Sequence, residues 1–179
     1  HNTCALMGTA LTDKHIELLK SINRPVNLML DSDEPGRNAI IKAVDQLEQN
    51  GIEVNVVDLK ELGELKDLGE YYEFVIKNTD KEKAGEKLAS LKSEIIRSKE
   101  KPVVFKIKRY LEEMELKSNL SLANIEDIYR KFKDQVKSSN LTAVTEYIES
   151  ISGYSHTEIQ EILNPVNKNY LEFLSASIN

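Results

Sequence analysis

Val26-Asn27-Leu28-Met29-Leu30-Asp31-Ser32-Asp33-Glu34-Pro35-Gly36-Arg37 is the stretch that decides the fold. Its first five residues are mostly apolar and predict a short buried strand. The Asp, Pro and Gly residues that follow at once are typical of a turn that leads into a helix. Apolar residues then recur at helical spacing, at Ile40, Ala43, Val44 and Leu47, and Asn50-Gly51 marks the helix end.

The segments on either side repeat this order of strand and helix. Upstream, residues 3–7 are a short, mostly apolar run that predicts the end of a strand, and Thr12 is placed to cap a helix. Downstream, Ile52, Val54 and Val56 alternate with polar residues, as in a half-buried strand. Strands and helices that alternate with short connections predict a parallel sheet with right-handed crossovers.

Strand signals largely stop near residue 78. From residue 80 onward the chain is charged and helix-prone, with one-sided apolar stripes that predict helices packed as a small bundle. Ser155 and Glu158 predict a capping box at the start of the last helix. We therefore expect an α/β domain over residues 1–78 and an all-helical region over residues 79–179, predominantly helical overall.

Bulk composition narrows the class of protein. Of the 179 residues, 40% are hydrophobic and 30% charged, as in globular domains, and no apolar run is long enough to span a membrane. A single cysteine, Cys4, excludes an internal disulfide and favours a reducing cytoplasm; we expect its thiol to be buried. The net charge of −6 argues against strong binding of duplex DNA by this chain alone.

Two carboxylates, Asp31 and Asp33, directly follow the predicted strand, where open parallel sheets place their ligands. Mg²⁺ needs only one or two carboxylates because it keeps several waters. Asp67 follows the next strand and could join them at the same sheet edge. The alternative is that these acids are ordinary cap and turn residues. The three histidines show no metal-ligand spacing, and the chain has no Walker A or Gly-x-Gly-x-x-Gly motif.

Two motifs together resemble the Toprim domain of bacterial DnaG-type primases. Gly8-Thr9-Ala10-Leu11-Thr12 is similar to the family's helix-opening block, and residues 31–39 are similar to its Asp-x-Asp-x-Ala-Gly-Arg-x-Ala motif, with Pro35 in place of alanine. Lys66-Asp67 resembles the start of the family's Lys-Asp-Pro-Asp motif. Leu68 and Gly69 replace its last two residues, so the final acid is missing unless Glu70 substitutes for it.

The resemblance implies template-directed synthesis of short RNA primers from ribonucleoside triphosphates on single-stranded DNA, by a metal-dependent nucleotidyl transfer. Asp31 and Asp33 would hold Mg²⁺ or Mn²⁺, with Asp67 as a further ligand, and Arg37 would contact phosphate or pair with the acids. The residues after 78 are similar to the helical subdomain that follows Toprim, and a replicative helicase is an expected partner through a further domain.

The family's catalytic glutamate, zinc domain and basic template-binding subdomain are expected upstream of His1, so this chain alone is expected to be inactive. Weak metal binding is expected for the same reason. Crowded, unpaired acids repel one another, so removal of Asp31 or Asp33 is expected to cost little stability. Two alternatives stay open: another Toprim enzyme that cleaves phosphodiesters, such as a nuclease or maturase, and a degenerate, non-catalytic Toprim interaction module.

Overall fold

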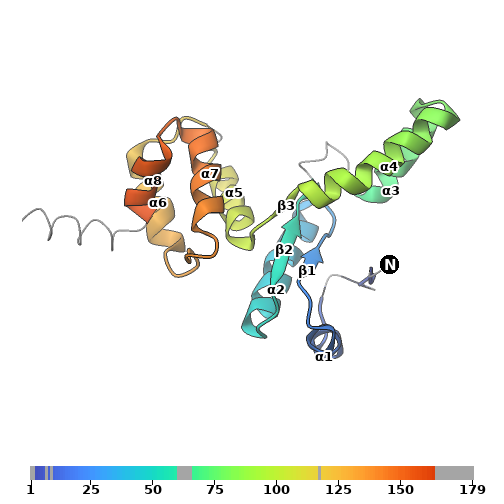
Figure 1. Ribbon diagram of the computed structural model, residues 1–179, viewed down its shortest axis with the longest axis horizontal. Helices are drawn as coiled ribbons and strands as arrows, with labels where there is room; N and C mark the ends of the chain where they lie inside the picture. The colour runs from blue at the N-terminus through green and yellow to red at the C-terminus, as the bar shows by residue number, and fades with distance from the viewer. Residues whose placement is uncertain (1–2, 7, 9, 60–65, 117, 164–179) are drawn as a thin grey trace, which may run out of the picture. The chain divides into compact units, whose positions relative to one another are not determined.

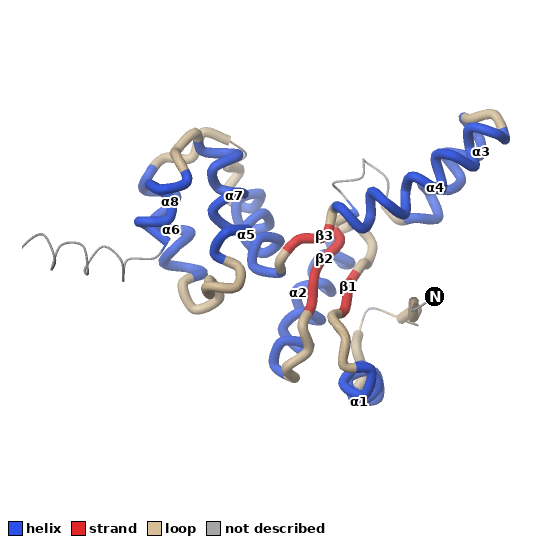
Figure 2. Tube along the Cα trace, viewed as in Figure 1, coloured by secondary structure: helices blue, strands red, loops and turns tan. Residues whose placement is uncertain are grey.

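The computed structural model describes residues 3–6, 8, 10–59, 66–116 and 118–163. They fall into two compact units, His1–Pro102 and Val103–Asn179. The first combines a small sheet with helices and the second is helical (Figures 1 and 2). The predicted fold class, a partial α/β domain followed by a helical region, is confirmed. In the described part of the chain, no helix is long and apolar enough to cross a membrane.

The first unit is built around a three-stranded sheet in the order β1-β2-β3 (Figure 2). β1 (Val26–Leu28) and β2 (Val54–Val57) run parallel, as the order of strands and helices predicts, and Val26 pairs with Val54. β3 (Lys99–Glu100) pairs antiparallel with β2 on its other side. Because β2 lies between two strands and its valines are buried, it forms the centre of this unit.

Four helices accompany this sheet: α1 (Asp13–Ile22), α2 (Glu34–Gln49), α3 (Leu68–Asn78) and α4 (Lys81–Arg97). Thr12 caps α1, since its hydroxyl accepts a hydrogen bond from the His15 backbone N–H, as predicted. α2 connects the two parallel strands and buries one face, which contains Ala39, Ile40, Ala43, Val44 and Leu47.

Three details of the first unit differ from the sequence prediction. Residues 3–6 form no strand, and Cys4 is exposed rather than buried; Met7, in the same predicted strand, lies outside the described residues. β3 was not predicted, because two charged residues carry no strand signal and form a strand only by pairing with β2. This pairing brings the chain back to the sheet, and the compact unit extends to Pro102.

The second unit contains α5 from Val103 onward (Pro102–Glu113), α6 (Leu122–Phe132), α7 (Leu141–Ser152) and α8 (His156–Leu163). Their apolar stripes share one core, as predicted, whereas the Met114 side chain, just after α5, is exposed. The fully buried members of this core are Ile107, Ile125, Ile128, Val144, Ile148 and Ile159.

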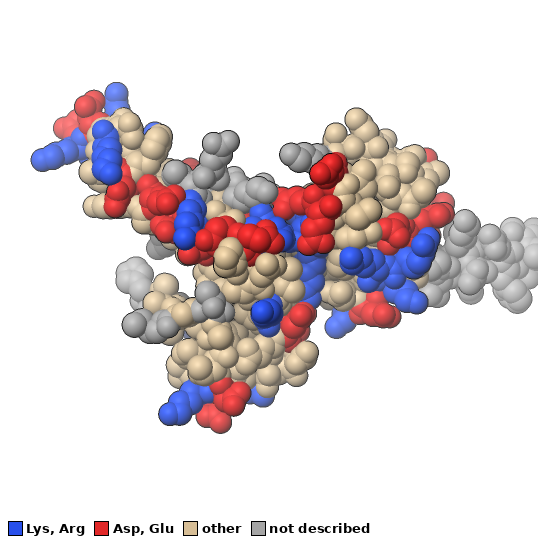
Figure 3. Space-filling model, turned by 180° about the vertical axis from the view of Figure 1, so that it is seen from behind, with Lys and Arg blue, Asp and Glu red and all other residues tan. Residues whose placement is uncertain are grey.

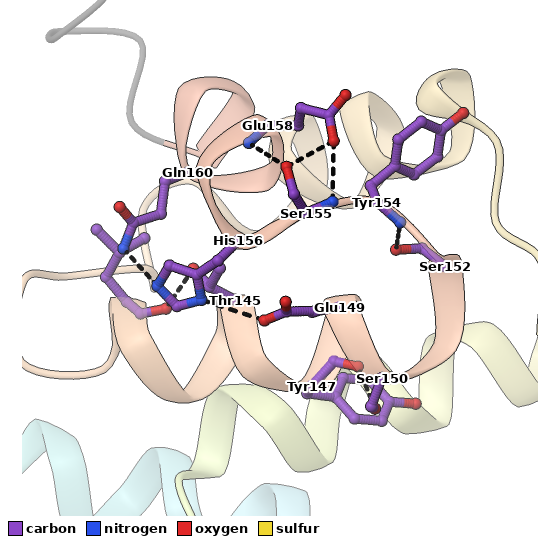
Figure 4. A network of polar contacts seen from close by, with 11 residues as sticks. Thr145, Tyr147, Glu149, Ser150, Ser152, Tyr154, Ser155, His156, Glu158 and Gln160 are labelled. Carbon is purple, nitrogen blue, oxygen red and sulfur yellow. Dashed lines mark hydrogen bonds and ion pairs between the residues drawn. The ribbon is translucent and has the colours of Figure 1, made fainter.

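A polar network joins α7 to α8 (Figure 4). Gly153 ends α7 with a left-handed backbone (φ 77°). The Ser155 hydroxyl accepts from the Glu158 N–H, and the Glu158 carboxylate accepts from the Ser155 N–H at 2.9 Å. The predicted capping box is therefore confirmed. Close by, His156 lies 3.3 Å from a Glu149 carboxylate oxygen.

Candidate functional site

Asp31 and Asp33 lie between the end of β1 and the start of α2, as the sequence predicts. Asp33 is the N-cap of α2, and its Oδ1 accepts a hydrogen bond from the Gly36 N–H at 2.9 Å. Its second oxygen, Oδ2, points to Lys66. One residue therefore fixes the helix start with one oxygen and offers the other to a cation.

Position 36 requires glycine because the start of α2 lies very close to the backbone of Asp31, and not because the backbone turns sharply there. A Cβ at this position would lie 2.3 Å from the backbone oxygen of Asp31, and the backbone φ is not in the left-handed region. The first turn of α2 thus packs directly against the loop that carries the acids. The absence of a side chain at residue 36 is what lets Asp31 sit there.

Lys66 is the cation that both acids face. Its Nζ lies 3.0 Å from Asp33 Oδ2 and 3.9 Å from Asp31 Oδ2. The hydrogen bond from the Gly36 N–H, and then the one from Lys66, hold the pKa of Asp33 below its ordinary range. The same contact with Asp33 raises the pKa of Lys66 above its ordinary value. The acids are therefore charge-compensated, and the expectation of an unpaired, mutually repelling pair is wrong.

Asp67 and Glu70 organise the start of α3. The Asp67 carboxylate caps this helix by accepting from the Glu70 N–H at 2.8 Å. Glu70 in turn accepts from the Lys66 N–H at 2.8 Å. The negative charge of Asp67, like those of Asp33 and Asp31, also raises the pKa of Lys66. In the described residues, however, no three Asp, Glu, His or Cys side chains form a group that could hold a metal ion.

Arg37 points into the protein interior. Its side chain and that of Asp58 are each 3% exposed, and Arg37 Nη2 lies 3.4 Å from Asp58 Oδ2. This pair ties the first turn of α2 to the residue that directly follows β2. Asp58 was missed by sequence reasoning, although its place after a strand, like that of Asp31, was a signal that could have found it.

The chemistry of the donor set fits a hard divalent cation. Two carboxylates offer oxygen ligands, the Asp31 side chain is 53% exposed, and a lysine ammonium already stands where positive charge is favoured. Mg²⁺ bound by one or two carboxylates and several waters suits such an open site. The geometry therefore supports one carboxylate pair at the carboxyl end of β1 as a cation-binding position.

Comparison with a family model finds a similarity in the first part of the chain. Residues 1–72 match the family described as Toprim-like. Over this segment the chain is similar to that family. The Toprim-like segment contains β1, α2 and β2 and ends within α3, so Asp31, Asp33, Lys66 and Asp67 all lie inside it.

Curated relatives point in the same direction. The DNA primase of Lactococcus lactis subsp. lactis (strain IL1403) is 43% identical over 54 residues, which are 30% of this chain and 8% of the relative. The DNA primases of Staphylococcus aureus strains COL and MRSA252 are 31% identical over 118 residues, which are 63% of this chain and 19% of the relatives. The resemblance to DnaG-type primases is thereby confirmed.

These matches cover part of this chain and a smaller part of each relative. The chain spans less than a fifth of the length of these relatives. An alignment of 118 residues is longer than the 72 residues of the Toprim-like segment, so the similarity continues into the helices that follow. No solved structure significantly matches the chain.

Proposed function

We propose that this chain is part of a DNA primase that synthesises short RNA primers on single-stranded DNA from ribonucleoside triphosphates. The observation that carries the proposal is the Asp31–Asp33 pair at the carboxyl end of a parallel strand, inside a segment that is Toprim-like and similar to DNA primases. Such relatives support the reaction class, and the acid pair supplies the residues for it.

Asp31 and Asp33 would hold Mg²⁺ or Mn²⁺ in this proposal. When bound, the metal stabilises the charge that develops on the reacting phosphate oxygens. Asp33 fixes the geometry, because its hydrogen bond to Gly36 ties the carboxylate to α2. Asp67 remains a proposed further ligand; its negative charge acts on Lys66, which faces the pair, while one of its oxygens caps α3.

Arg37 is assigned a structural role in place of the phosphate contact considered from the sequence. Its burial and its ion pair with Asp58 favour a function in fastening α2 to the end of β2. For the domains, we assign residues 1–78 to the C-terminal part of the Toprim domain and residues 79–179 to the helical subdomain of the polymerase core.

Template binding is assigned to other parts of the primase. In each unit, acidic and basic side chains of the described residues are intermixed on the surface drawn in Figure 3, which suits a weak contribution to DNA affinity. Priming activity is therefore proposed for the full-length parent and not for this chain alone. A replicative helicase as partner and a cytoplasmic location belong to the same proposal.

The test is an assay of the full-length parent with single-stranded DNA, ribonucleoside triphosphates and Mg²⁺. The proposal predicts short RNA products made only when template and metal are both present. Shortening of the DNA without RNA synthesis would instead assign the protein to the phosphodiester-cleaving Toprim enzymes. Neither product would indicate a non-catalytic Toprim module, and each of these last two results overturns the proposal.

A further inference from the structure

Lys66 is placed at the acid pair by its backbone as well as by its charge. The Ser32 N–H, between the two acids, donates to the Lys66 carbonyl oxygen at 2.8 Å. The Lys66 N–H donates to Glu70 Oε2 at the same distance. Two segments far apart in the sequence are thus joined at this one residue, which directs its side chain to Asp31 and Asp33.

The Lys66 ammonium group forms ion pairs with the carboxylates of both Asp31 and Asp33. It lies 3.0 Å from Asp33 and 3.9 Å from Asp31, so one positive charge compensates two negative ones. Two carboxylates near one another repel, and a cation that faces both of them offsets this repulsion. The Asp31 carboxylate therefore has an ion pair with Lys66, the same cation that pairs with Asp33.

The contact is also easy to release. The Lys66 side chain is 48% exposed, and it ends in a strongly hydrated charge on a flexible stem of four carbons. An exposed lysine–carboxylate pair contributes little free energy, so a divalent cation with oxygen preference can replace it. The backbone contacts of Lys66 do not depend on its side chain and would stay in place.

We propose that Lys66 is a built-in counter-ion of the Asp31–Asp33 pair, which holds the two acids ready in the metal-free protein and competes with the divalent cation for them. The inference rests on the proposed function, because it takes the acid pair as the metal site. It makes Lys66 a positioning residue that sets the strength of metal binding. Metal affinity is then limited by displacement of the lysine and not only by the number of ligands.

The experiment is a titration of the 179-residue chain with Mn²⁺ at fixed low ionic strength, in which EPR counts the free ion. The Lys66→Met variant is expected to bind Mn²⁺ roughly 3- to 10-fold more tightly than wild type, the effect of removing a weak competing ion pair. Lys66→Arg keeps the charge and should bind like wild type. Lys77→Met is the matched control, because it removes an equally charged, exposed lysine that pairs with Glu73 on α3.

The outcomes separate this inference from the proposed function. If an Asp31→Asn/Asp33→Asn variant loses Mn²⁺ binding while Lys66→Met binds like wild type, the counter-ion role is refuted and the metal site stands. If Lys66→Arg or Lys77→Met tightens binding as much as Lys66→Met, the local charge is not the cause and the inference also fails. If the double Asn variant binds like wild type, the acid pair is not the metal site and both proposals fall. Thermal melts by circular dichroism check that each variant is folded.

Discussion

Among the described residues of the first unit, Arg37 and Asp58 have the most completely buried charges. With 3% of each side chain exposed, neither charge can be solvated by water if its partner is removed. Breaking such a pair leaves an uncompensated buried charge, whereas losing an exposed pair costs almost nothing. The stability of the α2–β2 connection therefore depends on this pair.

Arg37→Met is expected to lower the free energy of unfolding by about 3 kcal/mol, because the buried Asp58 carboxylate then loses its ion pair with Arg37. Urea denaturation followed by circular dichroism measures the change. Lys77→Met, which breaks the exposed Lys77–Glu73 pair, should change stability by less than about 0.5 kcal/mol. Equal effects of the two substitutions would show that the Arg37–Asp58 pair is not buried as described.

Asp33 gives the site a defined pH dependence. Its pKa in the folded protein is lowered, first by the Gly36 N–H and then by Lys66, so its ionised form stabilises the fold. This contribution is fully present above the ordinary pKa of an aspartate and is lost as the pH falls through the lowered value. Removal of the side chain should therefore destabilise the protein at neutral pH, contrary to the expectation from the sequence.

The comparison of Asp33→Ala with Asp33→Asn tests this account. At pH 7, Asp33→Ala should be less stable than Asp33→Asn, because asparagine keeps the cap of α2. As the pH falls through the lowered pKa of Asp33, the difference in stability between wild type and Asp33→Asn should shrink, since wild type loses its charge there too. Denaturation curves between pH 7 and pH 2 provide the measurement. A wild-type advantage that stays constant over this range would contradict the lowered pKa.

At the scale of the helices, α2 and α4 each contain a glycine, and only the one in α2 has no room for a side chain. Gly36 faces the backbone of Asp31, where a Cβ would come within 2.3 Å of the carbonyl oxygen. Gly85 lies inside α4, and nothing within 4 Å would meet a Cβ there. The same substitution should therefore have opposite effects on stability in the two helices.

Gly36→Ala is expected to destabilise the protein by about 1–3 kcal/mol, since the Asp31 loop must move, and also to weaken Mn²⁺ binding. Gly85→Ala should stabilise it by about 0.5–1 kcal/mol, because alanine restricts the unfolded chain and favours the helix. Chemical denaturation of both variants checks the signs. A destabilising Gly85→Ala or a neutral Gly36→Ala would show that the surroundings of these glycines differ from those described.

At the scale of the whole chain, local patterns predicted the helices and the parallel strands well. Thr12, Ser155 and the apolar stripes act through neighbours three or four residues away, so their effect can be read from the sequence. β3 depends on pairing with a distant strand and gave no such signal. The same pairing extends the first compact unit to Pro102.

The candidate site shows the same limit. The positions of Asp31 and Asp33 after β1 were predicted correctly, because the end of a strand can be recognised locally. The contacts of Lys66 with these acids, and of Arg37 with Asp58, join residues that are distant in sequence. Such tertiary contacts decide which charges are compensated. They cannot be read from local sequence patterns, so the acids were expected to be unpaired.

The central claim is that Asp31 and Asp33 act on the reacting phosphate through a metal ion. The most direct test measures RNA primer synthesis by the full-length parent carrying Asp31→Asn or Asp33→Asn, with Glu73→Gln as an exposed control, alongside template binding at one fixed salt concentration. Both Asn variants are expected to lose primer synthesis by roughly 100-fold or more, while template binding changes less than about twofold. Primer synthesis by both variants at near wild-type rates would contradict it, and the two acids would then be cap and turn residues only.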